Sequence, residues 1–60
     1  MSEKDVQRLG FKVHAVTKFD DGLAFDAVPL RGRKKLVHGD KMPTYHLALA
    51  ALMMRCAEWR

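Results

Sequence analysis

Hydrophobic and polar residues alternate along residues 10–19, which include the stretch FKVHAVTKF. Alternation with a period of two is typical of a strand that buries one face. One face of this strand carries Phe11, Val13, Ala15, Thr17 and Phe19, and the other carries Lys12, His14, Val16 and Lys18. We therefore predict a half-buried strand whose second face is basic.

A second alternating stretch, LAFDAVPL, covers residues 23–30 and follows the sequence Asp-Asp-Gly. Residues 20–22 are typical of a three-residue hairpin loop in which the glycine has a positive φ. Such a loop pairs Phe19 with Leu23, so that the apolar faces of the two strands coincide. The two stretches together predict an antiparallel hairpin.

A third strand is expected over residues 33–38, RKKLVH, after a turn at Arg31 and Gly32. Four of the five residues from 31 to 35 are basic, which is unfavourable for a strand. A loop from Leu30 to Asp40 is the alternative. The predicted sheet therefore has two or three strands.

The last predicted element is a helix over residues 43–58. Asp40 or Thr44 can cap this helix, and Pro43 is tolerated in its first turn. One stripe along the helix is apolar and is expected to pack on the sheet. That stripe contains Tyr45, Ala48, Leu49, Leu52, Cys56 and Trp59. The predicted fold class is α+β, an antiparallel sheet with one C-terminal helix packed on one face.

A chain of 60 residues has room for one domain with a small core. We expect a flexible N-terminal arm over residues 1–8 and a single β-β-(β)-α domain over residues 9–60. Cys56 is the only cysteine, so an internal disulfide is impossible. Because oligomerisation is a common way to stabilise so small a domain, we expect a homodimer or another protein partner.

The expected partner surface is the side of the helix that faces away from the sheet. It contains Leu47, Ala50, Met53 and Met54, and the small alanine allows a second helix to come close. Methionine side chains adapt well to a partner. The alternative is that the alanines are present only because they favour a helix and tolerate solvent.

The histidines and carboxylates of the chain form no recognisable catalytic or metal-binding motif. His14, His38 and His46 lack the spacing of metal ligands, and Cys56 lies on the stripe that packs on the sheet. So short a chain also leaves little room for a substrate pocket. We expect a protein without enzymatic activity, cofactor or metal.

The expected location is the cytoplasm. The chain starts with the charged stretch MSEKDVQR, has a single cysteine, and shows no secretory hydrophobic segment. Its longest wholly apolar run, residues 47–54, has eight residues, whereas a membrane-spanning helix needs about 20. No membrane association is expected.

Positive charge is concentrated in one part of the chain. Eleven lysines and arginines outnumber seven aspartates and glutamates, and the stretch RGRKK at residues 31–35 is the densest basic segment. Together with the basic face of the first strand, it forms the expected contact surface for double-stranded DNA. The expected contacts are Lys12, Lys18, Arg31, Arg33, Lys34 and Lys35.

The leading functional hypothesis is a small, non-catalytic DNA-binding regulator, in which these cations contact phosphates and base edges. The same face contains no aromatic residue, which disfavours single-strand stacking. A solvated face whose lysines protect the sheet from aggregation is the structural alternative. The functional alternative is a protein-binding inhibitor or adaptor, a small regulator of the phage type, that acts through the outward side of the helix.

The expected order, three antiparallel strands followed by a C-terminal helix, resembles in outline two DNA-binding domains. They are the arm-binding domain of phage integrases and the plant ethylene-response-factor domain. The resemblance implies a sheet that lies in the major groove. It is limited to architecture, since the chain lacks the tryptophan-rich strands of the plant domain, and no residue role is carried over.

Overall fold

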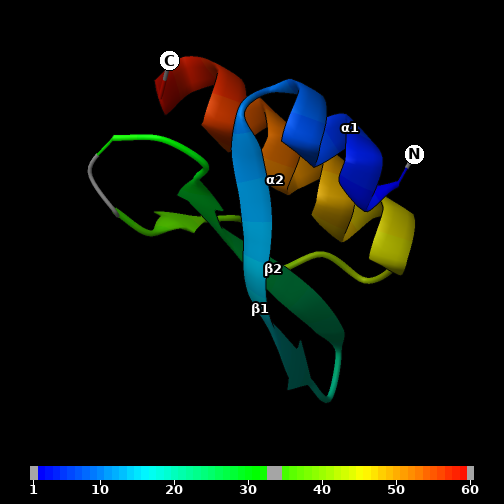
Figure 1. The fold of residues 1–60 in the computed structure, drawn as a ribbon. Coiled ribbons are helices and arrows are strands. Elements are labelled where there is room, and N and C mark those ends of the chain that lie inside the picture. Colours follow the sequence, from blue (N-terminus) through cyan, green and yellow to red (C-terminus); the bar gives the residue numbers. More distant parts are fainter. Residues whose placement is uncertain (1, 33–34, 60) are drawn as a thin grey trace.

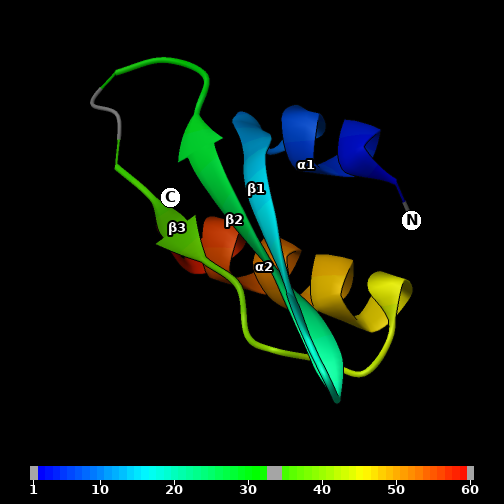
Figure 2. The same ribbon diagram turned by 90° about the horizontal axis from the view of Figure 1, so that it is seen from below.

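The computed structural model describes residues 2–32 and 35–59. The elements in chain order are α1 (Glu3–Arg8), β1 (Phe11–Phe19), β2 (Gly22–Pro29), β3 (Val37–His38) and α2 (Tyr45–Trp59). The strands form one antiparallel sheet in the order β1-β2-β3, and α2 packs against it (Figures 1 and 2). The α+β fold, the antiparallel sheet and the packed C-terminal helix are thus confirmed.

The N-terminal residues, predicted to be a flexible arm, instead form the short helix α1. The carboxylate of Asp5 accepts a hydrogen bond of 2.9 Å from the backbone N–H of Ser2, which stabilises the first turn. Val6 is completely buried, and Gly10, with a φ of +91°, ends the turn that follows the helix. The sequence did not predict α1 because one apolar side chain in six residues produces no helical periodicity.

The β1–β2 hairpin is confirmed, but its predicted register is wrong by one residue. Phe19 pairs with Gly22 rather than with Leu23, so the loop consists only of Asp20 and Asp21. Gly22 does not adopt a positive φ. Its small size is needed because the backbone of Met42 pairs with Leu23 immediately beside it.

A β-bulge between Val13 and Ala15 reverses the alternation of β1 partway along the strand. On the N-terminal side of the bulge, Val13 pairs with Ala27. On the C-terminal side, Val16 pairs with Phe25, which is buried against the helix layer. Before the bulge the odd-numbered residues of β1 face the helices, and after it the even-numbered residues do.

The third strand forms, but it is much shorter than predicted. Only Val37 and His38 pair with β2, opposite Ala27 and Asp26. Residues 35–36 lie outside the strand, and residues 33–34 of the predicted strand lie outside the described residues. Of the chain between β2 and β3, the described residues 30–32 and 35–36 form no strand.

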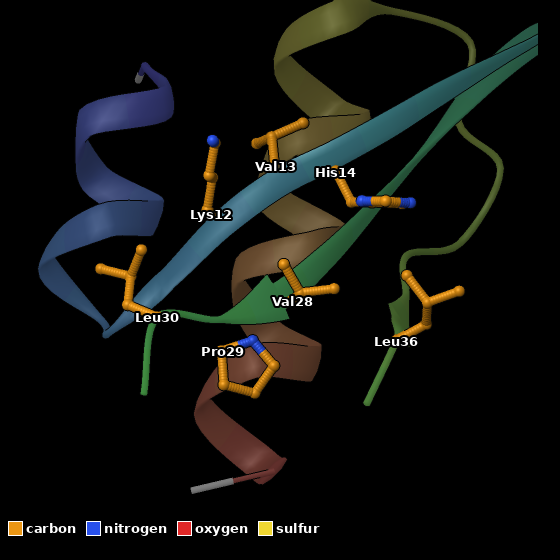
Figure 3. A pocket seen from close by; sticks show the side chains of 7 residues that line it. All are labelled: Lys12, Val13, His14, Val28, Pro29, Leu30 and Leu36. Atoms are coloured by element: carbon orange, nitrogen blue, oxygen red, sulfur yellow. The ribbon is translucent and has the colours of Figure 1, made fainter. Parts of the chain in front are cut away.

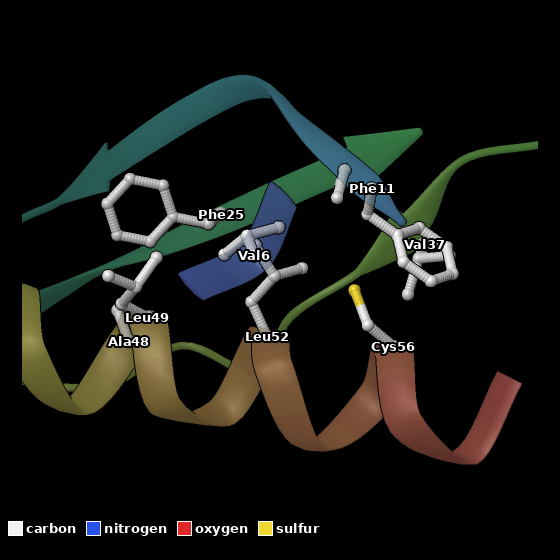
Figure 4. Packing of buried hydrophobic residues seen from close by; sticks show 9 residues of the cluster. Val6, Phe11, Phe25, Val37, Ala48, Leu49, Leu52 and Cys56 are labelled. Atoms are coloured by element: carbon white, nitrogen blue, oxygen red, sulfur yellow. The ribbon is translucent and has the colours of Figure 1, made fainter. Parts of the chain in front are cut away.

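The core lies between the sheet and the two helices (Figure 4). The predicted helical stripe is confirmed at its centre, where Ala48, Leu49, Leu52 and Cys56 are completely buried. At its ends, Tyr45 and Trp59 are partly exposed. The ring of Tyr45 meets that of Phe25 edge-on at a centroid distance of 5.3 Å, and the ring of Trp59 meets that of Phe11 at 5.4 Å. The Oγ1 of Thr44 accepts a hydrogen bond from the backbone N–H of Leu47, so Thr44, rather than Asp40, caps α2.

Gly39 lies between β2 and α2, at a position with no room for a side chain. Its N–H donates to the carbonyl oxygen of Phe25 at 2.7 Å, and a Cβ at this position would lie 2.8 Å from that oxygen and 3.2 Å from Cα of Leu52. We expect Gly39→Ala to lower the free energy of unfolding by about 1–3 kcal/mol, measured by urea denaturation.

Gly32→Ala is the matched control for this substitution. Gly32 has a φ of +86°, but apart from its chain neighbours no described atom lies within 4 Å of the position that an added Cβ would take. Its replacement therefore costs only backbone strain, about 1 kcal/mol. A Gly39→Ala variant no less stable than Gly32→Ala would contradict the close contact between the two layers.

Candidate functional site

The predicted DNA contacts that fall within the described residues are all exposed, but they do not all share one face. Lys12 pairs with Val28 on the outer face of the sheet, which the helices leave uncovered. Lys18 pairs with Leu23 on the opposite face, because the bulge reverses the alternation of β1. The prediction that Lys12 and Lys18 share one face of the strand is therefore wrong.

Arg31 and Lys35 are exposed in the loop that joins β2 to β3. Arg33 and Lys34, the other two predicted contacts of this loop, lie outside the described residues. The loop begins where β2 ends, at the end of the hairpin opposite to the acidic turn (Figure 2). The basic and acidic ends of the β1–β2 ribbon are therefore separated by its full length.

A hollow of about 560 Å³, here called the sheet hollow, lies between β1, β2 and this loop. Figure 3 shows Leu30 on one side of the hollow and Leu36 on the other, with Val28 between them. The lining residues are Lys12, Val13, His14, Val28, Pro29, Leu30 and Leu36. Leu30 and Leu36 are 54% and 43% exposed, so the lining of the hollow includes two exposed leucines. The lining of the hollow thus combines five apolar residues with Lys12 and His14.

The partners of the carboxylates could not be predicted from the sequence, because most of them come from another element. Asp26 of β2 lies 2.9 Å from Nδ1 of His38 on the neighbouring strand. Of the other carboxylates, those with ion-pair partners are Asp5 with Arg8, Asp21 with Lys41, Asp40 with Arg55, and Glu58 with Arg55, at 3.3, 2.8, 3.0 and 3.9 Å. Five of the seven aspartates and glutamates therefore have a basic side chain within ion-pair distance.

Four of the predicted DNA contacts are lysines and arginines without such a pair in the described part of the chain. Among the residues that the structure describes, Lys12, Lys18, Arg31 and Lys35 have no carboxylate within ion-pair distance. Their charges are open to solvent and are not neutralised within this part of the chain. Such charges raise the local concentration of a polyanion and release its counterions when it binds.

A second surface, here called the helix groove, follows the side of α2 that turns away from the sheet. It has a volume of about 460 Å³ and is lined by Asp40, Met42, Leu47, Ala50, Ala51, Met54, Arg55 and Glu58. Three of the four residues predicted for a partner surface therefore lie together. Met53 does not join them, because it follows Leu49 by four residues and packs against the core on the same side of the helix.

The described residues contain a buried cysteine and no cluster of metal ligands. Cys56 is buried, and burial raises the pKa of its thiol, which disfavours the reactive thiolate. No group of three His, Cys, Asp or Glu side chains within residues 2–32 and 35–59 could hold a metal ion. Neither helix in this part of the chain is long and apolar enough to cross a membrane.

Comparisons with known proteins do not identify a relative. No family model matches the chain, and neither the curated proteins nor the solved structures contain a match. A function is therefore inferred from the geometry and charge of these surfaces.

The pairing of Lys41 with Asp21 can be tested directly. Nζ of Lys41 donates to both carboxylate oxygens of Asp21, at 3.0 and 2.8 Å, and holds the pKa of Asp21 below its ordinary value. Lys41→Met is expected to raise the pKa of Asp21 toward that ordinary value, measured by a carboxyl NMR titration. Lys12→Met, which removes a lysine without an ion pair among the described residues, is expected to leave it unchanged.

The sign of the linked stability change follows from the lowered pKa. The carboxylate of Asp21 stabilises the fold above its unfolded-state pKa, and this contribution disappears as the pH falls through the lowered folded-state pKa. The stability difference between wild type and Lys41→Met should therefore be present at neutral pH and vanish in acid. A difference that grows in acid would show that Lys41 acts in another way.

Proposed function

We propose that this protein is a small, non-catalytic regulator that binds double-stranded DNA through the outer face of its sheet. The observation that carries the proposal is the exposed Lys12 in the lining of the sheet hollow, together with exposed Arg31 and Lys35, which adjoin its lining residues Leu30 and Leu36 in the sequence. Lysine and arginine contact phosphates, while Leu30 and Leu36 suit the sugars and the methyl groups of thymine. Binding at this face needs no movement of the helices, which lie on the other side.

The charge along the hairpin supports one orientation on the duplex. The tip carries Asp20 and Asp21, which phosphates would repel, although Lys41 partly neutralises Asp21. The other end of the ribbon carries Lys12 and adjoins the loop with Arg31. Two strands about 5 Å apart fit a major groove about 12 Å wide. The proposed contact therefore involves the loop end of the ribbon, with the acidic tip directed away from the DNA.

The proposal predicts that the affinity for DNA falls steeply with salt concentration, and that these cations determine how steeply. Each phosphate contact contributes about 0.9 to the slope of log affinity against log salt. We expect the combined substitution Lys12→Gln, Arg31→Gln and Lys35→Gln to reduce that slope by about 2.7 if all three contacts are lost. The measurement is fluorescence anisotropy of a labelled blunt 20-base-pair duplex across a salt series.

Arg55→Gln is the matched control, since Arg55 lies in the helix groove and is paired with Asp40. Its affinity for the duplex should equal that of the wild type. A triple variant that keeps its circular dichroism spectrum, and also keeps the wild-type affinity and slope, would exclude the outer face as the DNA-binding surface.

We propose a second role for the helix groove, the binding of a second copy of this chain. Leu47 and Met54 are 46% and 66% exposed, with Ala50 between them at spacings of three and four residues. A two-fold axis that passes α2 near Ala50 places Leu47 of one copy against Met54 of the other, with the small residues in the middle. The groove is therefore self-complementary in size, which favours a homodimer over an unrelated inhibitor target or adaptor partner.

Leu47→Glu combined with Met54→Glu should convert this dimer to a monomer, measured by light scattering over a dilution series. A carboxylate in a desolvated helix–helix contact is strongly unfavourable without a cation to pair with it. Val16→Glu is the matched control, because Val16 is 45% exposed but lies on the hairpin, outside the groove. A wild-type protein that is monomeric at every concentration would contradict this role.

A further inference from the structure

A third hollow lies where the two helices and the first two strands meet, at the end of the sheet near the β2–β3 loop. This corner hollow has a volume of about 260 Å³ and is formed by separate segments of the chain. The lining residues are Leu9, Gly10, Phe11, Pro29, Leu30, Arg31 and Trp59. It combines apolar walls with an exposed indole and one arginine, which is a different chemistry from that of the helix groove.

Trp59 is held in the corner hollow by the core. Its ring meets that of buried Phe11 at a centroid distance of 5.4 Å and an interplanar angle of 81°. This edge-on contact fixes the indole while leaving the residue 44% exposed. An indole that is oriented by packing and open to solvent can stack on a planar ring with little loss of side-chain entropy.

The corner hollow is smaller than the usual pocket for a drug-sized ligand, which begins at about 300 Å³. It therefore suits a single planar group. Arg31 lines the same hollow and has no carboxylate within ion-pair distance among the described residues. A planar ring on an aromatic side chain, with an anion next to it on an arginine, is the chemistry by which proteins bind unpaired nucleotides.

The corner hollow is continuous with the proposed DNA-binding surface. Pro29 and Leu30 line both this hollow and the sheet hollow, so Leu30 stands between the two. A strand whose phosphates pass Lys12 on the outer face can therefore turn around Leu30 and place its next base on Trp59. The pattern of β1 in the sequence predicts no aromatic residue on the outer face. The β-bulge moves Phe19 to that face at the acidic end of the hairpin, whereas Trp59 lines the corner hollow at the other end of the ribbon, from the end of α2.

We propose that the corner hollow is a stacking site for one unpaired nucleobase, with Trp59 as the platform and Arg31 as the contact to the adjoining phosphate. This inference rests on the proposed DNA binding and makes it more specific. The preferred ligand is a duplex with a single-stranded end or an extruded base, rather than an uninterrupted duplex.

Trp59 is the only tryptophan, so its fluorescence reports on this site without a label. The probes are three DNA molecules that share one 20-base-pair duplex: a blunt end, a three-thymidine overhang, and an overhang of three abasic nucleotides. We expect the thymidine overhang to quench Trp59 and to bind roughly fivefold to a hundredfold more tightly than the abasic one. The abasic overhang carries the same phosphates, so the comparison isolates the base.

Two variants separate stacking from a structural role of the ring. Trp59→Leu is expected to bind thymidine and abasic overhangs equally, while its affinity for the blunt duplex stays that of the wild type. Trp59→Phe keeps an aromatic ring against Phe11 and should restore a preference for the thymidine overhang in the anisotropy assay. If Trp59→Leu fails to fold, the wild-type comparison of the three probes, together with Trp59→Phe, still decides the question.

The failure of this inference can be distinguished from that of the proposed function. Equal wild-type affinity for thymidine and abasic overhangs, without base-dependent quenching, would overturn the stacking site even if the blunt duplex binds with the expected salt slope. Base-dependent quenching without measurable binding of the blunt duplex would support the stacking site and overturn duplex binding. Absence of binding to all three probes would overturn both.

Discussion

The close packing of β2 on α2 is the constraint on which the rest of the structure depends. Gly39 permits it, since a side chain there would meet the backbone of Phe25 and of Leu52. The same contact fixes the segment that leads into α2, because Gly39 and Met42 both form backbone hydrogen bonds to β2. With α2 held across one face of the sheet, the other face is left uncovered, and the surfaces proposed for binding follow from that division.

Features with a regular period could be predicted from the sequence, and features set by long-range contacts could not. The two long strands and the stripe of Leu49, Leu52 and Cys56 follow from periods that are visible in the residues themselves. The hairpin register was predicted one residue off. Leu23 pairs with Met42 instead of belonging only to the hairpin, and these residues lie 19 positions apart in the sequence. A local pattern cannot predict such a contact. The helix α1 depends on the burial of Val6 against elements that come later in the chain.

The candidate site was predicted in part, for related reasons. The exposure of Lys12, Arg31 and Lys35 follows from their charge, and the structure places Lys12 on the uncovered face and the other two between β2 and β3. Lys18 was assigned to the wrong face, because the residues around His14 contain no sequence signal that predicts a bulge. The corner hollow was missed entirely, since its walls come from the turn after α1, the start of β1, the end of β2 and the end of α2. A tryptophan near a helix end was its only local signal.

The arrangement in two layers has a geometric consequence for the two proposed surfaces. The sheet hollow lies on the uncovered face of the sheet, and the helix groove lies on the side of α2 that turns away from the sheet. Two copies joined through their helix grooves would stack as sheet, helix, helix, sheet, with both basic faces on the outside and pointing apart. Such a pair cannot clamp one duplex between its halves. The proposed dimer would instead crosslink two separate duplexes and hold them at a fixed spacing.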